Sequence, residues 1–335
     1  MGGIVTDDVK ILRELYRVGE AGISGAALAE RMAVSRAAIW ARIEELRKLG
    51  FDIEASPHLG YRIKSGPSSL IGEDLQARLT EGLVIGRSVQ VYRETDSTNE
   101  LAERLGRDGV DEGAVIVAEH QTKGRGRLGR TWQSQGGQGI LMSVLLRPAL
   151  RPPEMTRLTI VGATASVRAI ERCTSIKPEI KWPNDIVVGG LKLAGILTEM
   201  SAELDRVRYA VLGIGLNVNQ TEEDFSGELA SIGTSLRLLG GEKVDRSNLA
   251  VAMMEELDRD YGRALGGGFS DLVAEWQERC STLGRDVSVN IGGGHVEGCA
   301  EALDEDGALL VRTTAGMLQR ITGGDVSLSS VRGNT

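Results

Sequence analysis

The sequence is poor in the residues that form metal and disulfide sites. It has three histidines and three cysteines in 335 residues, and Cys173, Cys280 and Cys299 lie far apart. No CxxC pair and no Cys/His cluster occurs, so we expect neither a metal site nor a disulfide framework. An odd number of scattered cysteines is typical of a reducing compartment, which predicts a cytoplasmic protein.

Long apolar runs are missing as well. No segment approaches the roughly 20 residues of a membrane-spanning helix, and the first residues do not resemble a signal peptide, so we expect no membrane association. The net charge is −8. Any binding of nucleic acid must therefore be confined to one module. The chain is 41% hydrophobic and long enough for two or three globular domains.

The first 65 residues have the pattern of a winged helix-turn-helix. Apolar residues recur at helical spacing in three short segments, and two strand-like runs follow them. The expected elements are a first helix marked by Ile11, Leu12 and Leu15, helices at 25–32 and 36–49, and wing strands at 51–53 and 61–63.

The third of these helices is the candidate for DNA recognition, because the second helix of a helix-turn-helix enters the major groove. Its start and exposed face would carry the candidate DNA-binding residues Ser35, Arg36, Ala37, Trp40 and Arg47. Arg36 can reach phosphate or guanine, and Trp40 can lie against a thymine methyl group. A protein-docking module is the alternative, because residues 1–66 hold ten Lys and Arg against nine Asp and Glu.

The rest of the chain predicts two further domains. Residues 64–70 are small and polar with a proline, which is typical of a linker. Strands flanked by helices follow, and they favour an α+β domain with a mixed sheet over a doubly wound parallel fold. Short alternating runs between glycine-rich turns end the chain and indicate a five-strand barrel. The expected boundaries are 1–65, 66–280 and 281–335.

One segment, residues 124–132, alternates three arginines with three glycines; we call it the Arg/Gly loop. Such a loop cannot offset the entropy of ordering itself, so we expect it to close only over an anion. A solvated surface loop is the alternative. Its glycines also satisfy the dinucleotide-binding pattern G-x-G-x-x-G, but no helix follows them, which disfavours a Rossmann turn.

The middle domain contains four more motifs: Asp-Ser-Thr-Asn at 96–99, Lys-Trp-Pro-Asn-Asp at 181–185, Lys-Leu-Ala-Gly-Ile-Leu at 192–197 and Gly-Ile-Gly-Leu-Asn at 213–217. A cap, a turn or a hairpin would explain each alone. Together with the Arg/Gly loop they closely resemble, over essentially the whole chain, the bifunctional biotin protein ligases that are also biotin operon repressors. This resemblance implies a class II synthetase-like catalytic domain and an SH3-like C-terminal barrel.

The resemblance implies a two-step reaction. Biotin and ATP, with Mg²⁺, would give biotinyl-5′-AMP and pyrophosphate, and the biotinyl group would then pass to a lysine of a biotin carboxyl carrier protein. Attack of a carboxylate on a phosphate brings anions together, so cations must stabilise the transition state. Arg127, Lys192 and Lys181 are the catalytic candidates, and no protein metal ligand is assigned.

The resemblance also assigns binding residues. Biotin's ureido ring needs polar partners, because an unpaired buried polar group costs about 1–3 kcal/mol. The candidates for biotin are Ser97, Thr98, Asn99, Gln121, Gly124, Arg125, Arg127, Lys192 and Gly195. The candidates for the nucleotide are Arg130, Trp132 and Asn217, and Asn217 would bind the amino edge of adenine.

Two positions depart from the family pattern. Some members end the barrel with Ser-Leu-Arg, where this chain has Ser329 after Leu328, and some stack adenine on a tryptophan where this chain has Gly233. In the repressor members the adenylate promotes a homodimer that binds operator DNA, so the resemblance implies the same partners here. A lipoate or octanoate ligase-like enzyme and a regulator without catalysis are the competing interpretations.

Overall fold

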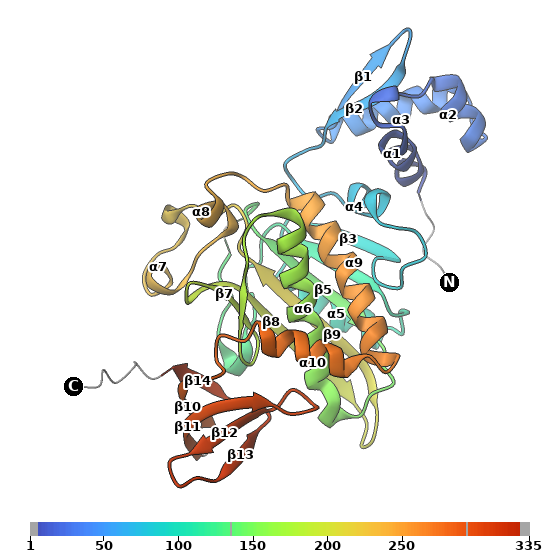
Figure 1. The fold of residues 1–335 in the computed structure, drawn as a ribbon. Helices are drawn as coiled ribbons and strands as arrows, with labels where there is room; N and C mark the ends of the chain where they lie inside the picture. Colours follow the sequence, from blue (N-terminus) through green and yellow to red (C-terminus); the bar gives the residue numbers. More distant parts are fainter. Residues whose placement is uncertain (1–5, 135, 293, 329–335) are drawn as a thin grey trace.

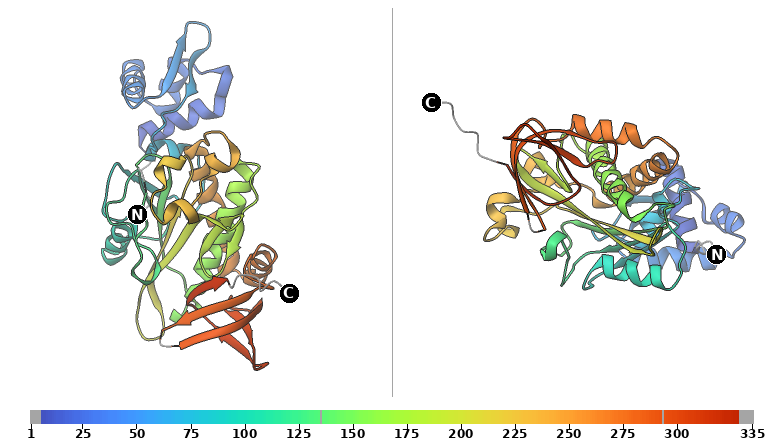
Figure 2. Two further views of the ribbon diagram at one scale, coloured as in Figure 1. Left: turned by 90° about the vertical axis from the view of Figure 1, so that its left-hand side faces the viewer. Right: turned by 90° about the horizontal axis from the view of Figure 1, so that it is seen from below.

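The computed structural model describes residues 6–134, 136–292 and 294–328, and its three parts follow one another along the molecule (Figure 1). The N-terminal helices lie at one end, a seven-stranded sheet lies in the middle, and the C-terminal strands lie at the opposite end (Figure 2). This arrangement confirms the predicted fold class of a winged helix, an α+β domain with a mixed sheet and a small C-terminal β domain.

The N-terminal part is the predicted winged helix-turn-helix. It contains α1 (Asp7–Val18), α2 (Gly25–Met32), α3 (Arg36–Lys48), β1 (Asp52–Ser56) and β2 (Gly60–Ser65). The side chains of Ser24 and Ser35 cap α2 and α3 by accepting a backbone N–H of the first turn. Ile39, Ile43 and Leu46 are buried along one face of α3, so the opposite face is left to solvent.

The central sheet is mixed, with the order β3-β4-β5-β9-β8-β7-β6. Only β3 and β4 pair in parallel among its neighbours. The strands are β3 (Ser88–Tyr92), β4 (Ala114–Ala118), β5 (Ile140–Leu146), β6 (Glu179–Lys181), β7 (Asp185–Val188), β8 (Leu191–Ala202) and β9 (Val207–Leu216). Every residue of β4 and β5 is buried, because helices cover both faces of the sheet.

The helices form one layer on each face. α5 (Thr98–Arg107) packs on one face with Ala114 and Ile116, while Val115 and Val117 face the larger core on the other. The larger core holds α6 (Thr156–Cys173), α9 (Arg246–Leu265) and α10 (Phe269–Glu278), and short helices α7 (Leu229–Ile232) and α8 (Leu236–Gly240) precede α9. No described helix is both long enough and apolar enough to cross a membrane.

The C-terminal strands form an antiparallel sheet with the order β13-β12-β11-β10-β14. They are β10 (Asp286–Ile291), β11 (Gly294–Leu303), β12 (Leu309–Thr313), β13 (Leu318–Ile321) and β14 (Asp325–Leu328). Trp182 fixes this sheet to the catalytic domain, since its indole N–H donates to the carbonyl of Gly307 at 3.1 Å and its backbone N–H donates to Thr282 Oγ1 at 3.0 Å. Ser329, where the family pattern departs, lies outside the described residues.

A helix that sequence reasoning missed, α4 (Gly72–Arg78), joins the winged helix to the sheet. It packs against α1, where Tyr16 donates a hydrogen bond to Asp74 and receives one from Arg78 Nη2 at 2.7 Å. Ala77 belongs to the winged-helix core. The helix has seven residues and no side-chain cap, so its sequence carries little helical signal.

Candidate active site

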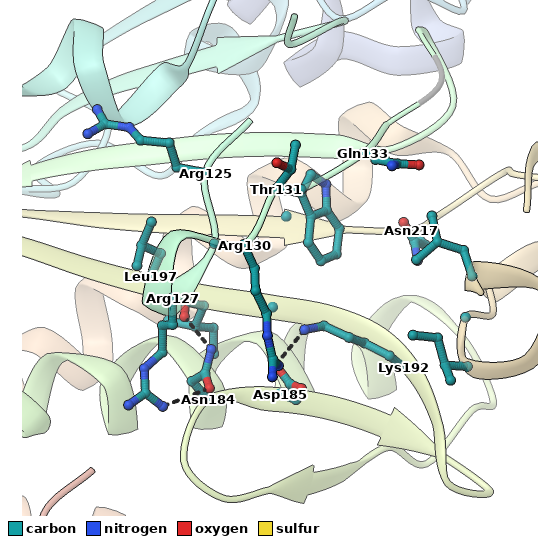
Figure 3. A pocket seen from close by; sticks show the side chains of 18 of the residues that line it. Arg125, Arg127, Arg130, Thr131, Gln133, Asn184, Asp185, Lys192, Leu197 and Asn217 are labelled. Carbon is teal, nitrogen blue, oxygen red and sulfur yellow. Dashed lines mark hydrogen bonds and ion pairs between the residues drawn. The ribbon is translucent and has the colours of Figure 1, made fainter. Parts of the chain in front are cut away.

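A cavity of about 1030 Å³ lies beside β7, β8 and β9, where the predicted motifs meet (Figure 3). They meet because these strands are neighbours in the sheet and because the Arg/Gly loop crosses over them. The lining includes the predicted residues Ser97, Thr98, Asn99, Gln121, Arg125, Arg127, Arg130, Trp132, Lys181, Lys192, Gly195 and Asn217. Gly124 lines a second cavity instead, which Leu197 and Glu199 of β8 also line.

One end of the cavity is a buried polar network at the start of α5. The backbone N–H and the hydroxyl of Thr98 donate to Gln121 Oε1 at 2.7 and 2.9 Å. Ser143 Oγ lies 2.7 Å from Thr98 Oγ1 and 2.6 Å from Asn99 Oδ1, and Asn99 Nδ2 donates to Glu199 at 2.6 Å. These bonds hold the polar side chains in fixed positions.

The Gly-Ile-Gly motif explains how this network and the Arg/Gly loop both reach β9. Gly213 and Gly215 point to the same side of the strand, because residues two apart share a face. A Cβ on Gly213 would lie 2.1 Å from Asn99 Oδ1, and a Cβ on Gly215 would lie 2.5 Å from the Trp132 ring. Asn99 and Trp132 therefore occupy the space that side chains at positions 213 and 215 would fill.

The Arg/Gly loop folds back on itself as a narrow hairpin. Gly126 N–H donates to the carbonyl of Arg130 at 2.7 Å, and Trp132 N–H donates to that of Gly124 at 2.9 Å. Leu128 lies at the tip with φ +55° and is 72% exposed. The expectation that the loop orders only over an anion stays a prediction.

The three arginines of the loop are held by three different elements. Arg125 pairs with Glu199 of β8, and Arg130 pairs with Asp325 of β14 in the C-terminal sheet. Arg127 Nη1 donates to Asn184 Oδ1 at 3.1 Å, in the turn before β7 (Figure 3). Of the three, only Arg127 forms no ion pair with a described residue, and burial lowers its pKa. Its charge is the one left for a ligand anion.

Lys192 and Lys181 lie on the strands beneath the loop. Lys192 Nζ is 2.7 Å from Asp185 Oδ1 and 5.7 Å from the centre of the Trp132 ring (Figure 3). Lys181 ends β6 and lines the same cavity. Asp185 is the carboxylate that lies beside Lys192. Within the described residues, no three His, Cys, Asp or Glu side chains are grouped as metal ligands.

At the other end of the cavity, Asn217 is largely engaged within the protein. It is buried, its Nδ2 donates to the carbonyl of Thr234 at 3.0 Å, and its Oδ1 accepts from Gln220 Nε2 at 3.3 Å. The Phe225 ring covers Gly233, where a Cβ would lie 2.8 Å from it. Gln220 and Phe225 line the cavity, but no sequence motif marks them.

Three residues that line the cavity each have one buried polar atom with no partner among the described residues. These atoms are the indole nitrogen Nε1 of Trp132, the hydroxyl of Ser134 and the amide oxygen Oε1 of Gln220. Buried polar groups in folded proteins are almost always paired. A donor and acceptors left unpaired in one cavity therefore indicate a polar ligand there.

Three family models match the chain in the order of its parts. A model described as HTH domain matches residues 9–62, the biotin/lipoate A/B protein ligase family matches 91–217, and the biotin protein ligase C terminal domain matches 282–329. The bifunctional ligase/repressor BirA of Bacillus subtilis (strain 168) is 38% identical over 95% of this chain and 98% of its own length. The chain belongs to the family of bifunctional ligase/repressors.

Other relatives agree. The bifunctional ligase/repressor BirA of Escherichia coli (strain K12) is 31% identical over 92% of this chain and 93% of its own. The structure of the biotin protein ligase from Aquifex aeolicus in complex with biotin and ATP is similar, with a TM-score of 0.61 and 32% identity over 72% of this chain and 97% of that chain. Membership of the family confirms the resemblance that the motifs indicated.

The winged helix of this ligase/repressor exposes part of the predicted DNA-binding face. Arg36, Ala37 and Trp40 are exposed, and Trp40 is 59% accessible. Ser35 caps α3, and Arg47 is turned to the wing, where Nε and Nη2 donate to the carbonyl of Ile53 at 3.0 and 2.6 Å. Among the Lys and Arg residues of 6–65, Arg36 alone forms no ion pair with a described residue.

Gly215→Ala tests the packing of Trp132 on β9. The added methyl group would lie 2.5 Å from the ring, so the indole must move, at a cost of about 1–3 kcal/mol for overpacking. We expect the fluorescence spectrum of Trp132 to change, where this spectrum is the difference between each protein and its matched Trp132→Phe variant. We also expect weaker ligand binding. Gly262→Ala, in open space on α9, is the control and should change neither. An unchanged Trp132 spectrum in Gly215→Ala would contradict this packing.

Proposed function

We propose that this chain is an ATP-dependent biotin protein ligase that also acts as a biotin-responsive transcriptional repressor. The observation that carries the proposal is the layout of one cavity. Arg127, Lys181 and Lys192 line it, and it also takes in the buried polar network at Thr98 and the segment around Asn217. Cations that line one cavity with two polar ends suit the joining of a carboxylate to a nucleotide.

In this proposal the polar network binds the ureido ring of biotin. Ser97, Thr98, Asn99 and Gln121 supply hydroxyl and amide groups. Thr98 and Gln121 orient each other by hydrogen bonds, and Ser143 and Glu199 orient Asn99 before biotin arrives. Ser97 precedes α5 as its N-cap residue but makes no cap hydrogen bond with its hydroxyl, so that hydroxyl can serve the ligand. Gly195 and Arg125 contribute backbone groups near the ring, whereas Gly124, the other predicted backbone contact, lines the second cavity.

Biotin's carboxylate takes the place of Asp185 as the partner of Lys192. Lys192 Nζ is already 2.7 Å from one carboxylate oxygen, so the exchange keeps Lys192 paired with a carboxylate. The biotin oxygen attacks the α-phosphorus of ATP, the bond to the β-phosphate breaks, and pyrophosphate leaves. Arg127 and Lys181 stabilise the negative charge that builds up on the phosphate oxygens.

Mg²⁺ fits this proposal as the companion of ATP. Magnesium is usually held by substrate phosphates and one or two carboxylates, and Asp185 is a carboxylate beside the proposed phosphate position. When bound, it would neutralise phosphate charge. The residues of the chain perform the binding and orientation described above.

The second step needs no nucleophile from this chain. The amine of a carrier lysine attacks the acyl carbon of biotinyl-5′-AMP, an amide bond forms, and AMP leaves. A closed Arg/Gly loop would exclude water from the mixed anhydride until the carrier protein binds. Arg127 then acts as a latch on the intermediate, with Arg130, Trp132 and Asn217 at the nucleotide.

The winged helix makes the chain a repressor in this proposal. We infer that residues 1–65 bind operator DNA, that 66–280 catalyse the reaction and that 281–335 form the C-terminal domain. Arg36 contacts the DNA, and Ala37 and Trp40 contact base edges or methyl groups. One unpaired cation gives a monomer little affinity, so we propose a homodimer that the adenylate promotes. We place the protein in the cytoplasm, where its carrier and operator are.

Exchange of labelled pyrophosphate into ATP tests the first half-reaction without a carrier. We expect exchange that depends on biotin, because the cavity joins a carboxylate to the α-phosphate. Lipoate, octanoate and no acid are the controls. Exchange only with lipoate or octanoate would show that this acid, and not biotin, is the substrate. No exchange with any acid would indicate a regulator without catalysis.

Arg127→Gly separates adenylate formation from adenylate retention. The variant removes the loop's unpaired cation, so we expect biotinyl-5′-AMP to form more slowly and to escape into solution at least about tenfold faster than from wild type, the equivalent of one lost charged hydrogen bond. Release is measured by rapid filtration. Arg206→Gly, an exposed arginine in the turn between β8 and β9, is the control. Retention equal to that of wild type would rule out the latch.

Sedimentation with and without biotinyl-5′-AMP tests the proposed dimer. We expect the adenylate to shift the chain from monomer to dimer and to raise its affinity for a duplex selected by the wild-type chain from a random pool. Arg36→Ala should leave the dimer intact but weaken DNA binding about tenfold or more. Arg17→Ala, an exposed paired arginine on α1, is the control. The same monomer with and without adenylate would contradict the proposal.

A further inference from the structure

The linker between the winged helix and the catalytic domain, residues 66–70, is bound at both of its ends. A Cβ on Gly50, just after α3, would lie 3.2 Å from Pro67, so the linker begins in contact with the winged helix. The side chain of Leu70 belongs to the core of the catalytic domain. Two serines separate these contacts. A linker this short passes the position of its anchors on to the winged helix.

Two side chains of the catalytic domain hold the backbone of this linker. Glu119 Oε1 accepts a hydrogen bond from the backbone N–H of Leu70 at 2.6 Å, and Arg246 Nη2 donates to the carbonyl of Ser68 at 2.7 Å. Glu119 follows β4 in the sheet, and Arg246 is the first residue of α9. The linker backbone therefore has a donor and an acceptor that a different part of the chain satisfies.

Glu119 and Arg246 also bind each other, and we call this ion pair the linker lock. Their side chains are 13% and 5% exposed, and Arg246 Nη1 and Nη2 donate to the two carboxylate oxygens at 2.6 and 3.0 Å. Arg246 Nη1 also donates to the carbonyl of Gly139, just before β5, at 3.0 Å. All the hydrogens of the two terminal guanidinium nitrogens are thus used. An ammonium group cannot replace this fork, because it offers its donors from a single nitrogen.

A second contact holds the winged helix beside the linker lock. Arg78 of α4 donates from Nη2 to the Tyr16 hydroxyl and from Nη1 to Asn248 Oδ1, both at 2.7 Å. Tyr16 lies on α1 of the winged helix, and Asn248 lies in the first turn of α9, as Arg246 does (Figure 1). The first turn of α9 therefore holds the linker directly and the first helix of the winged helix through Arg78.

We propose that the linker lock fixes the orientation of the winged helix on the catalytic domain and so sets the distance between the two winged helices of the proposed dimer. The inference rests on the proposed repressor function and names a device that serves it. The half-sites of an operator lie one helical turn or a multiple of it apart, so a dimer reaches both only if its modules are spaced to match. Modules that are already in place lose less entropy on binding than modules on free linkers.

Cleavage of the full chain by subtilisin measures how often the linker is released. The protease cuts an opened segment, so the rate of cleavage follows the population in which the linker lock is open. Arg246→Lys keeps the charge beside Glu119 but cannot also serve the carbonyls. We expect cleavage within residues 66–70 to be at least about tenfold faster, the equivalent of one lost charged hydrogen bond. Arg259→Lys, an exposed arginine later in α9, is the control and should be cut like wild type.

Glu119→Gln tests the linker lock from its other side. An amide offers one oxygen where the carboxylate offers two, so Leu70 and Arg246 would compete for it. We expect the same faster cleavage, with Glu305→Gln, an exposed glutamate near the start of β12, as the control. Circular dichroism checks the folding of each variant. Cleavage as slow as that of wild type in a folded lock variant would overturn the proposal.

The dependence of DNA binding on half-site spacing tests what the linker lock does for the dimer. Each chain, with biotinyl-5′-AMP, is bound to the duplex selected by wild type and to the same duplex with about 5 base pairs, half a helical turn, inserted between the half-sites. We expect the insertion to weaken binding at least about tenfold more for wild type than for Arg246→Lys, because released modules can follow the rotated half-site. Arg259→Lys should match wild type.

The outcomes distinguish this inference from the function on which it rests. A wild-type chain that binds no duplex would overturn the repressor function and, with it, the role of the linker lock. An insertion that weakens wild type and Arg246→Lys equally would overturn that role alone. Faster cleavage together with a smaller effect of the insertion, in both lock variants but not in Arg259→Lys, would support the proposal. Pyrophosphate exchange should stay close to that of wild type throughout, because Glu119 and Arg246 lie outside the cavity lining.

Discussion

The site depends on the bare backbone of β9. Gly213 and Gly215 present no side chains on the face where α5 and the Arg/Gly loop approach, so Asn99 and Trp132 can lie directly on the strand. Any larger residue at either position would displace one of them. The polar network fixes one end of the cavity, and Trp132 anchors the end of the loop that carries the arginines. Both walls are therefore positioned by one strand that is itself held in the middle of a seven-stranded sheet.

The charges at the site are distributed so that one is left for a ligand. Glu199 and Asp325 pair with Arg125 and Arg130, which attach the Arg/Gly loop to the sheet and to the C-terminal strands. Among the described residues, Arg127 has only an amide partner, Asn184, which is neutral. A loop with all three arginines paired would be stable but would offer no unpaired positive charge to an anion. A loop with none paired would have no reason to lie over the cavity.

Local signals made most of the fold predictable. The helical spacing of apolar residues in the first 65 residues indicated α3, and the short alternating runs between glycine-rich turns indicated the C-terminal strands. The motif residues of the site were predictable because their order is typical of the family. α4 was missed because it is short and uncapped. Gln220 and Phe225 were missed because their importance comes from contacts with Asn217 and Gly233, which only the folded chain brings together.

The described residues form three hydrophobic cores, and the two largest differ in which parts of the chain they join. Buried residues of the C-terminal sheet, such as Val289 and Val311, belong to the same continuous core as those of the catalytic domain. The winged helix has its own core, to which the rest of the chain contributes little more than Ala77. The catalytic domain and the C-terminal sheet thus share one core, whereas the DNA-binding module packs mainly on itself. In evolutionary terms, such a module can be gained, lost or retuned to a new operator without disturbing catalysis.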